Sequence, residues 1–102
     1  MTILAIADAA SADEAAILDD LYAVVGPRTA LKFRTQFSGL YDRLTEHPEI
    51  GAPRPRIGRN IRIGIVSPFI AIYRYDRASD TVTILRWVHG RRRISGVLLG
   101  KT

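Results

Sequence analysis

Alternation of apolar and polar residues is strongest between residues 61 and 94, which read IRIGIVSPFIAIYRYDRASDTVTILRWVHGRRRI. β-branched and aromatic residues recur there at every second position, the period of a strand with two different faces. Two breaks interrupt the alternation: Ser67-Pro68, where proline presets φ and cannot donate to a ladder, and the polar segment 76–80. The pattern predicts an antiparallel meander of three strands, near 60–66, 69–76 and 81–89.

The chain before this stretch has a helical period. Ser11-Ala12-Asp13-Glu14 forms a capping-box pattern, which predicts the start of a helix. Apolar residues then recur at helical spacing up to Val25. Gly26-Pro27 predicts a break, because glycine suits the position after a helix and proline suits the first turn of the next one. We therefore expect a first helix near 11–25.

A second helix is predicted near 28–47. Its apolar residues form one stripe at helical spacing: Phe33, Phe37, Leu40, Tyr41 and Leu44. His47-Pro48 ends it, because the residue before a proline avoids the α region. The two helices predict an antiparallel hairpin whose stripe covers the sheet, so these aromatic residues are expected to be core residues.

The order of elements indicates an α+β fold. A short apolar run at 2–7, TILAIA, predicts an N-terminal strand before the helical hairpin. The expected order is therefore β-α-α-β-β-β, with the hairpin packed on a small antiparallel sheet. At 102 residues the whole chain, 1–102, is expected to be a single domain. The segment 51–60, GAPRPRIGRN, is rich in proline, glycine and arginine and predicts a loop leading into the sheet.

Composition excludes several classes of chemistry. The chain has no cysteine, so neither disulfides nor thiolate chemistry are expected. No apolar run approaches the ~20 residues that span a bilayer, and no basic segment precedes an apolar one at the N-terminus. We therefore expect a cytoplasmic protein. No metal-ligand spacing, catalytic triad pattern or glycine-rich phosphate loop is present, so neither a metal nor another cofactor is predicted.

Charge divides the chain into two halves. Residues 1–53 carry four basic and eight acidic side chains, a net charge of −4, and residues 54–102 carry eleven and two, a net charge of +9. Such a split suggests a polyanionic partner for the second half. The alternative is a solvated basic face that has no partner.

Three segments together resemble the RelE/ParE toxin superfamily of type II toxin–antitoxin systems, and its ParE-like branch in particular. They are LTEHPEIG at 44–51, IRIGIVSPFIAIYRYD at 61–76 and VTILRWVHGRRRI at 82–94. The resemblance implies the same α+β fold, growth arrest by inhibition of DNA gyrase, and a cognate ParD-type antitoxin that binds in a hetero-oligomer. It implies no small-molecule substrate and no membrane partner.

RelE-like members of the superfamily instead cleave mRNA on the ribosome, and the resemblance allows their catalytic set to be compared position by position. Arg62 matches a basic residue of the first meander strand, and Arg92 matches an arginine that follows the last strand. Ile70 stands where another arginine is expected, and Leu98 where a tyrosine is expected. His89 resembles a terminal histidine used by some ribonuclease members, but residues 50–75 contain no carboxylate to accompany it.

The comparison favours a gyrase inhibitor that is not an enzyme. An mRNA endonuclease using Arg62, His89 and Arg92 is the alternative, and a non-toxic nucleic-acid-binding module is a second one. The residues predicted to contact the target are Arg62, Arg86, His89, Arg91, Arg92 and Arg93. The residues predicted to contact the antitoxin are Leu18, Tyr22, Phe37 and Tyr41.

Overall fold

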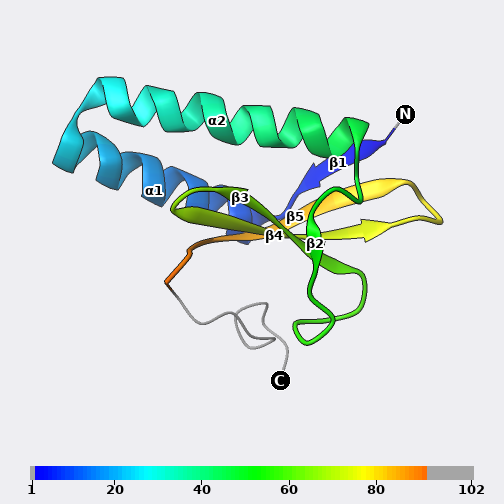
Figure 1. Cartoon of the computed structure of the whole chain (residues 1–102). Coiled ribbons are helices and arrows are strands. Elements are labelled where there is room, and N and C mark those ends of the chain that lie inside the picture. Colours follow the sequence, from blue (N-terminus) through cyan, green and yellow to red (C-terminus); the bar gives the residue numbers. More distant parts are fainter. Residues whose placement is uncertain (1, 92–102) are drawn as a thin grey trace.

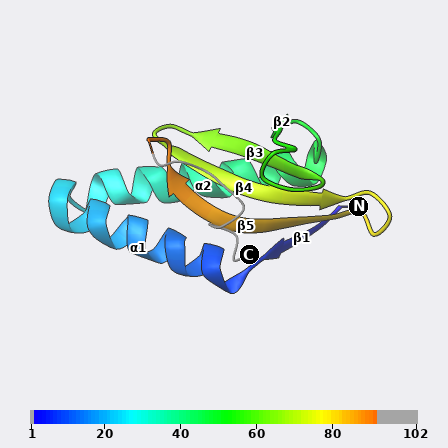
Figure 2. The same ribbon diagram turned by 90° about the horizontal axis from the view of Figure 1, so that it is seen from below.

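The computed structural model describes residues 2–91 of the chain. Two helices lie along one face of a five-stranded sheet (Figure 1), and Figure 2 shows the molecule from below. The predicted Arg92, Arg93 and Leu98 fall outside the described residues. In chain order the elements are β1 (Ile3–Ile6), α1 (Asp8–Val25), α2 (Pro27–Glu46), β2 (Ala52–Pro53), β3 (Ile61–Val66), β4 (Phe69–Asp76) and β5 (Thr81–His89).

The first helix begins one turn earlier than its sequence pattern suggested. Ala7 is the N-cap of α1 and has no side-chain cap, so the predicted capping box at Ser11 is wrong. The Ser11 amide already donates to the Ala7 carbonyl at 3.0 Å, within the helix. The Ala7 amide donates to the Ile84 carbonyl at 2.9 Å, so the pairing of β1 with β5 continues up to the first helical residue. Ala7 alone separates the strand from the helix, and its methyl group cannot accept a capping hydrogen bond.

The break between the helices follows the prediction. Gly26 has a φ of 101°, which favours glycine, and its amide closes α1 on the carbonyls of Leu21 and Tyr22. Pro27 then opens α2, which ends at Glu46, close to the expected boundary. Within residues 2–91, neither helix combines the length and the apolar character needed to cross a membrane.

The meander of β3, β4 and β5 is confirmed, with antiparallel pairing throughout. The register of β4 with β5 shifts by one residue between Ile72 and Tyr73, so that Leu85 is the extra residue on β5. The N-terminal strand pairs in parallel with β5, from Ile3 opposite Thr81 to Ile6 opposite Ile84, so the complete sheet is mixed. The strand order is β1-β5-β4-β3-β2, with β2 a two-residue strand at the far edge.

The main core lies between the helices and the sheet. The predicted stripe of α2 supplies it: Phe37, Leu40 and Leu44 are buried, while Phe33 and Tyr41 pack at its margin. The rings of Phe37 and Trp87, from β5, have centroids 4.3 Å apart. The opposite face of the sheet carries a second, smaller cluster formed by Ile57, Ile61, Ile63, Ile72 and Val88. Both faces of the sheet are therefore apolar, as the sequence predicted.

Candidate functional site

The predicted target-contacting residues do not converge on one point. Arg62 lies near the start of β3, and Val66 at its other end pairs with Phe69, which pairs with His89. His89 therefore sits four residues further along the sheet than Arg62, about 13 Å at ~3.3 Å per residue. Of the residues proposed for ribonuclease chemistry, Arg62 and His89 thus lie at opposite ends of the meander, and Arg92 lies outside the described residues.

The hydrogen bonds of Arg62 hold a turn in place. Its Nη1 donates to the carbonyl oxygens of Glu49 and Gly51, both at 2.8 Å, and its Nη2 donates to Glu49 Oε2 at 3.3 Å. The same turn is fixed from inside by Tyr73, whose hydroxyl donates to the Pro48 carbonyl and accepts from the Gly51 amide, each at 2.9 Å. A Cβ at Gly51 would lie 2.4 Å from the Ile63 carbonyl oxygen, so only glycine fits there. The segment 48–51 is therefore a structural turn clamped by Arg62 and Tyr73.

Arg86 is also held by the fold. Its Nε and Nη2 donate to the two carboxylate oxygens of Asp13, at 2.6 and 3.1 Å, and the Trp87 amide donates to Asp13 Oδ2 at 3.0 Å. This hydrogen-bonded ion pair raises the pKa of Arg86 further above its usual value. It joins α1 to β5, so Arg86 is a bridge between layers as well as a predicted target contact. This pairing between residues 73 positions apart is not predictable from local patterns, in which Asp13 belongs to a capping box.

His89 and Arg91 occupy the exposed end of β5. The His89 ring packs edge-on against Phe69 with centroids 5.8 Å apart, and its Nδ1 accepts from the Arg91 amide at 3.1 Å. A shallow pocket of about 260 Å³ adjoins them, lined by Ile65 and Ile70 among others. With Ile70 in the position of an expected arginine, this end presents cations beside an aliphatic surface.

The helical hairpin exposes apolar side chains at its tip. Leu18 and Tyr22 of α1 and Leu31 of α2 line a groove of about 370 Å³, and Tyr22 and Leu31 are 61% and 63% exposed. Phe37, by contrast, is fully buried in the core, so its predicted contact with an antitoxin is wrong. The α2 stripe that suggested it is the core face of the helix. Tyr41 is half-buried and its hydroxyl is bonded internally, donating to Glu14 and accepting from Trp87 Nε1.

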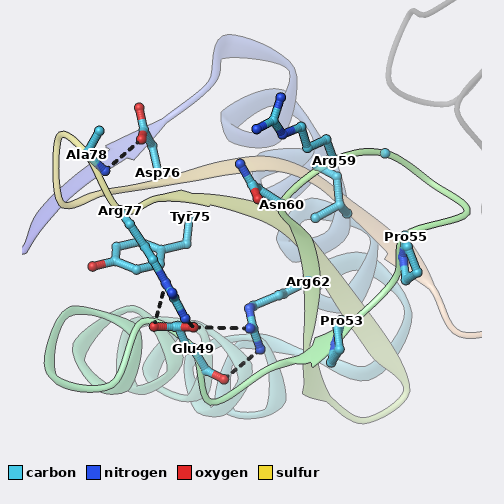
Figure 3. Close-up of a pocket in the computed structure, with 12 residues that line it drawn as sticks. Glu49, Pro53, Pro55, Arg59, Asn60, Arg62, Tyr75, Asp76, Arg77 and Ala78 are labelled. Carbon is cyan, nitrogen blue, oxygen red and sulfur yellow. Dashed lines mark hydrogen bonds and ion pairs between the residues drawn. The ribbon is translucent and has the colours of Figure 1, made fainter.

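The largest described pocket was not predicted. It has a volume of about 590 Å³ and lies where the segment between β2 and β3 meets the β4–β5 hairpin (Figure 3). Glu49, Arg59, Arg62, Tyr75 and Arg77 contribute to its lining. The three arginines of the 51–60 segment were the available signal, but the sequence could not show that Arg59 lines a pocket together with Arg77. Within residues 2–91, no group of three or more histidine, aspartate or glutamate side chains is arranged to hold a metal ion.

Comparison with protein families settles which branch the sequence resembles. The family model described as "ParE toxin of type II toxin-antitoxin system, parDE" matches residues 4–94. The chain belongs to the ParE toxin family. This confirms the resemblance to the RelE/ParE superfamily and its α+β fold. A comparison with curated proteins finds no match.

Solved structures give the same fold. A chain of the chromosomal ParDE toxin–antitoxin system from P. aeruginosa is 28% identical with a TM-score of 0.73, over 87% of this chain and 96% of that one. A chain of the toxin–antitoxin complex RelBE2 from Mycobacterium tuberculosis is 24% identical with a TM-score of 0.60, over 86% and 90%. The second likeness concerns the fold alone, so membership of the ParE family is what separates this toxin from the RelE-like ones.

Proposed function

We propose that this ParE-family toxin arrests growth in the cytoplasm by inhibiting DNA gyrase, and that a ParD-type antitoxin neutralises it. The observation that carries the choice of target is the family match over residues 4–94. The geometry of Arg62 supports it, because a guanidinium bonded to two backbone carbonyls and a carboxylate is not free to hold a scissile phosphate. Ile70 supports it as well, since an aliphatic side chain neither binds a phosphate nor moves a proton.

The end of β5 is the proposed gyrase-contacting surface. His89 and Arg91 are exposed there, and Arg92 and Arg93, outside the described residues, follow directly in the sequence. Clustered cations beside the exposed Ile65 suit a protein partner that itself carries DNA. Arg62 and Arg86 were also predicted to contact the target, but both are hydrogen-bonded within the fold.

The groove at the tip of the helical hairpin is the proposed antitoxin site. Leu18, Tyr22 and Leu31 offer apolar anchor positions for an amphipathic partner segment, the usual way in which a helix is received in a groove. Arg34 at its margin suits an acidic residue of that segment. The similar chain from P. aeruginosa comes from a ParDE toxin–antitoxin system, which supports a partner of this kind.

A supercoiling assay with purified protein tests the target. Inhibition of gyrase that increases with toxin concentration and is reversed by the antitoxin is the expected result. Robust cuts at ribosomal A-site codons in primer extension on ribosome-bound message, with no effect on supercoiling, would instead identify an mRNA endonuclease. Normal growth on induction at verified expression would indicate a non-toxic binding module.

A further inference from the structure

The unpredicted pocket beside Glu49 already holds an oxyanion between two arginines. Arg77 donates from Nε to Glu49 Oε1 at 3.2 Å and from Nη2 to Oε2, while Arg62 Nη2 reaches Oε2 at 3.3 Å (Figure 3). The hydrogen bond from Arg77 is the main cause of a Glu49 pKa below its usual value, so the carboxylate stays charged at neutral pH. Arg62 stays bonded to the turn at 48–51, but the planar fork that Arg77 presents fits a phosphate as well as a carboxylate.

The Glu49 carboxylate can be replaced by an anion from solution. Its side chain is 40% exposed and that of Arg77 is 77% exposed, so the ion pair lies in water at the mouth of the pocket. Exposed pairs of this type contribute little to stability. A ligand that offers a phosphate therefore competes against a weak internal partner.

The cations around the pocket are held by an anchored loop. Ile57 is buried against the sheet, and the Arg54 amide donates to the Ile61 carbonyl at 2.8 Å. Asn60, with a φ of 60°, turns the chain into β3, and its carbonyl accepts from the Tyr75 amide at 3.2 Å. With Ile57 pointing inward, the three arginines of the loop are all exposed: Arg54, Arg56 and Arg59.

We propose that this pocket and its loop, named here the Arg59–Arg77 surface, bind the backbone phosphates of DNA. Exposed guanidinium groups on the loop and at the pocket match the repeated charges of a phosphodiester chain. An acidic peptide is a poorer match, because Ile61, the one large aliphatic residue of the pocket, is buried, and the exposed apolar residues there, Pro53, Pro55 and Ala78, are small anchors. The surface lies at the opposite end of the meander from His89, so it adds a DNA contact separate from the proposed gyrase surface.

Fluorescence anisotropy with a short labelled duplex, measured without gyrase, tests the proposal. Each lost phosphate contact lowers the slope of log affinity against log salt by about 0.9. The double variant Arg59→Ala/Arg77→Ala should therefore have a slope that is smaller by about 1.8. Raising the salt concentration from about 50 to about 200 mM should then lower its affinity for the duplex about 12-fold less than it lowers the affinity of the wild type. The matched control Arg28→Ala/Lys32→Ala removes two exposed cations from α2 and should leave the slope unchanged.

A second pair of variants changes charge in the other direction. Glu49→Gln removes the internal competitor of the Arg59–Arg77 surface and should tighten DNA binding. Asp42→Asn removes an equally exposed negative charge from α2 and should change affinity less. Unchanged thermal midpoints of all four variants separate these effects from misfolding.

Three results would overturn the proposal. They are equal salt slopes for the two double variants, no duplex binding by the wild type at about 50 mM salt, and stronger binding of a polyglutamate peptide than of DNA at equal charge. Because gyrase is absent from this assay, failure of DNA binding leaves the supercoiling result untouched. If gyrase is not inhibited, the salt dependence of DNA binding is likewise unaffected.

Discussion

Removing one oxygen atom from Tyr73 tests whether the turn at 48–51 is clamped from inside. Tyr73 is fully buried, and its hydroxyl is bonded to the backbone of both Pro48 and Gly51. Tyr73→Phe keeps the ring in the core and deletes both hydrogen bonds. At about 1 kcal/mol net for each bond, the free energy of unfolding should fall by about 2 kcal/mol.

Thermal and urea unfolding, followed by circular dichroism, measure this loss. An unfolding entropy of about 2.1 cal/mol/K per residue gives about 0.2 kcal/mol/K for this chain, so the midpoint temperature should fall by about 9 °C. Tyr22→Phe is the matched control, because it deletes the same atom from a side chain that is 61% exposed. If Tyr73→Phe lowers the free energy of unfolding no more than Tyr22→Phe does, Tyr73 does not clamp the turn.

The pH dependence gives a second measure of the same contact. Burial raises the pKa of Tyr73 above its usual value of about 10. Above pH ~10 the unfolded chain releases this proton while the folded chain keeps it, so the stabilising effect is complete below pH ~10 and is lost as the pH rises further. The decline of stability above pH ~10 should be shallower in Tyr73→Phe than in the wild type.

Four further changes have distinct readouts. Asp13→Asn should lower the free energy of unfolding by about 1–3 kcal/mol, because it breaks a part-buried ion pair, and Asp19→Asn on the exposed side of α1 should not. Asp80 has a pKa below its usual value, chiefly because the Tyr75 hydroxyl donates to it. Its stabilising effect is therefore present above pH ~4 and is lost on acidification. In acid unfolding curves, Asp80→Asn should lose less stability as the pH falls than the wild type does. Leu31→Asp should weaken antitoxin binding in a titration and leave toxicity intact. Replacing residues 91–93 with alanine should abolish growth arrest at equal expression and leave the thermal midpoint unchanged, and undiminished arrest would contradict the proposed gyrase surface.

Local patterns were sufficient to predict the elements. The change of period near Gly51 separates helices from strands, and Gly26-Pro27 marks the hairpin because those residue types have restricted or unusual backbone angles. The start of α1 was missed for the opposite reason. It is set by the pairing of Ala7 with Ile84, a contact that no local pattern reports.

The site residues were harder to predict because charge alone does not say what an arginine binds. Arg62 and Arg86 were expected to face a partner, yet each is paired within the fold, with Glu49 and Asp13. Phe37 shows the same ambiguity for an apolar residue, since a helical stripe fits either a core or a docking face. Only the tertiary arrangement separates these alternatives.

The parallel pairing of β1 with β5 has a consequence for synthesis. The first strand to leave the ribosome, at Ile3–Ile6, finds its partner only when Thr81 to Ile84 have emerged. Closing so long a loop makes this contact late and slow relative to the helical hairpin. The nascent chain thus carries an unpaired apolar strand throughout the synthesis of the helical hairpin and of the meander up to β5.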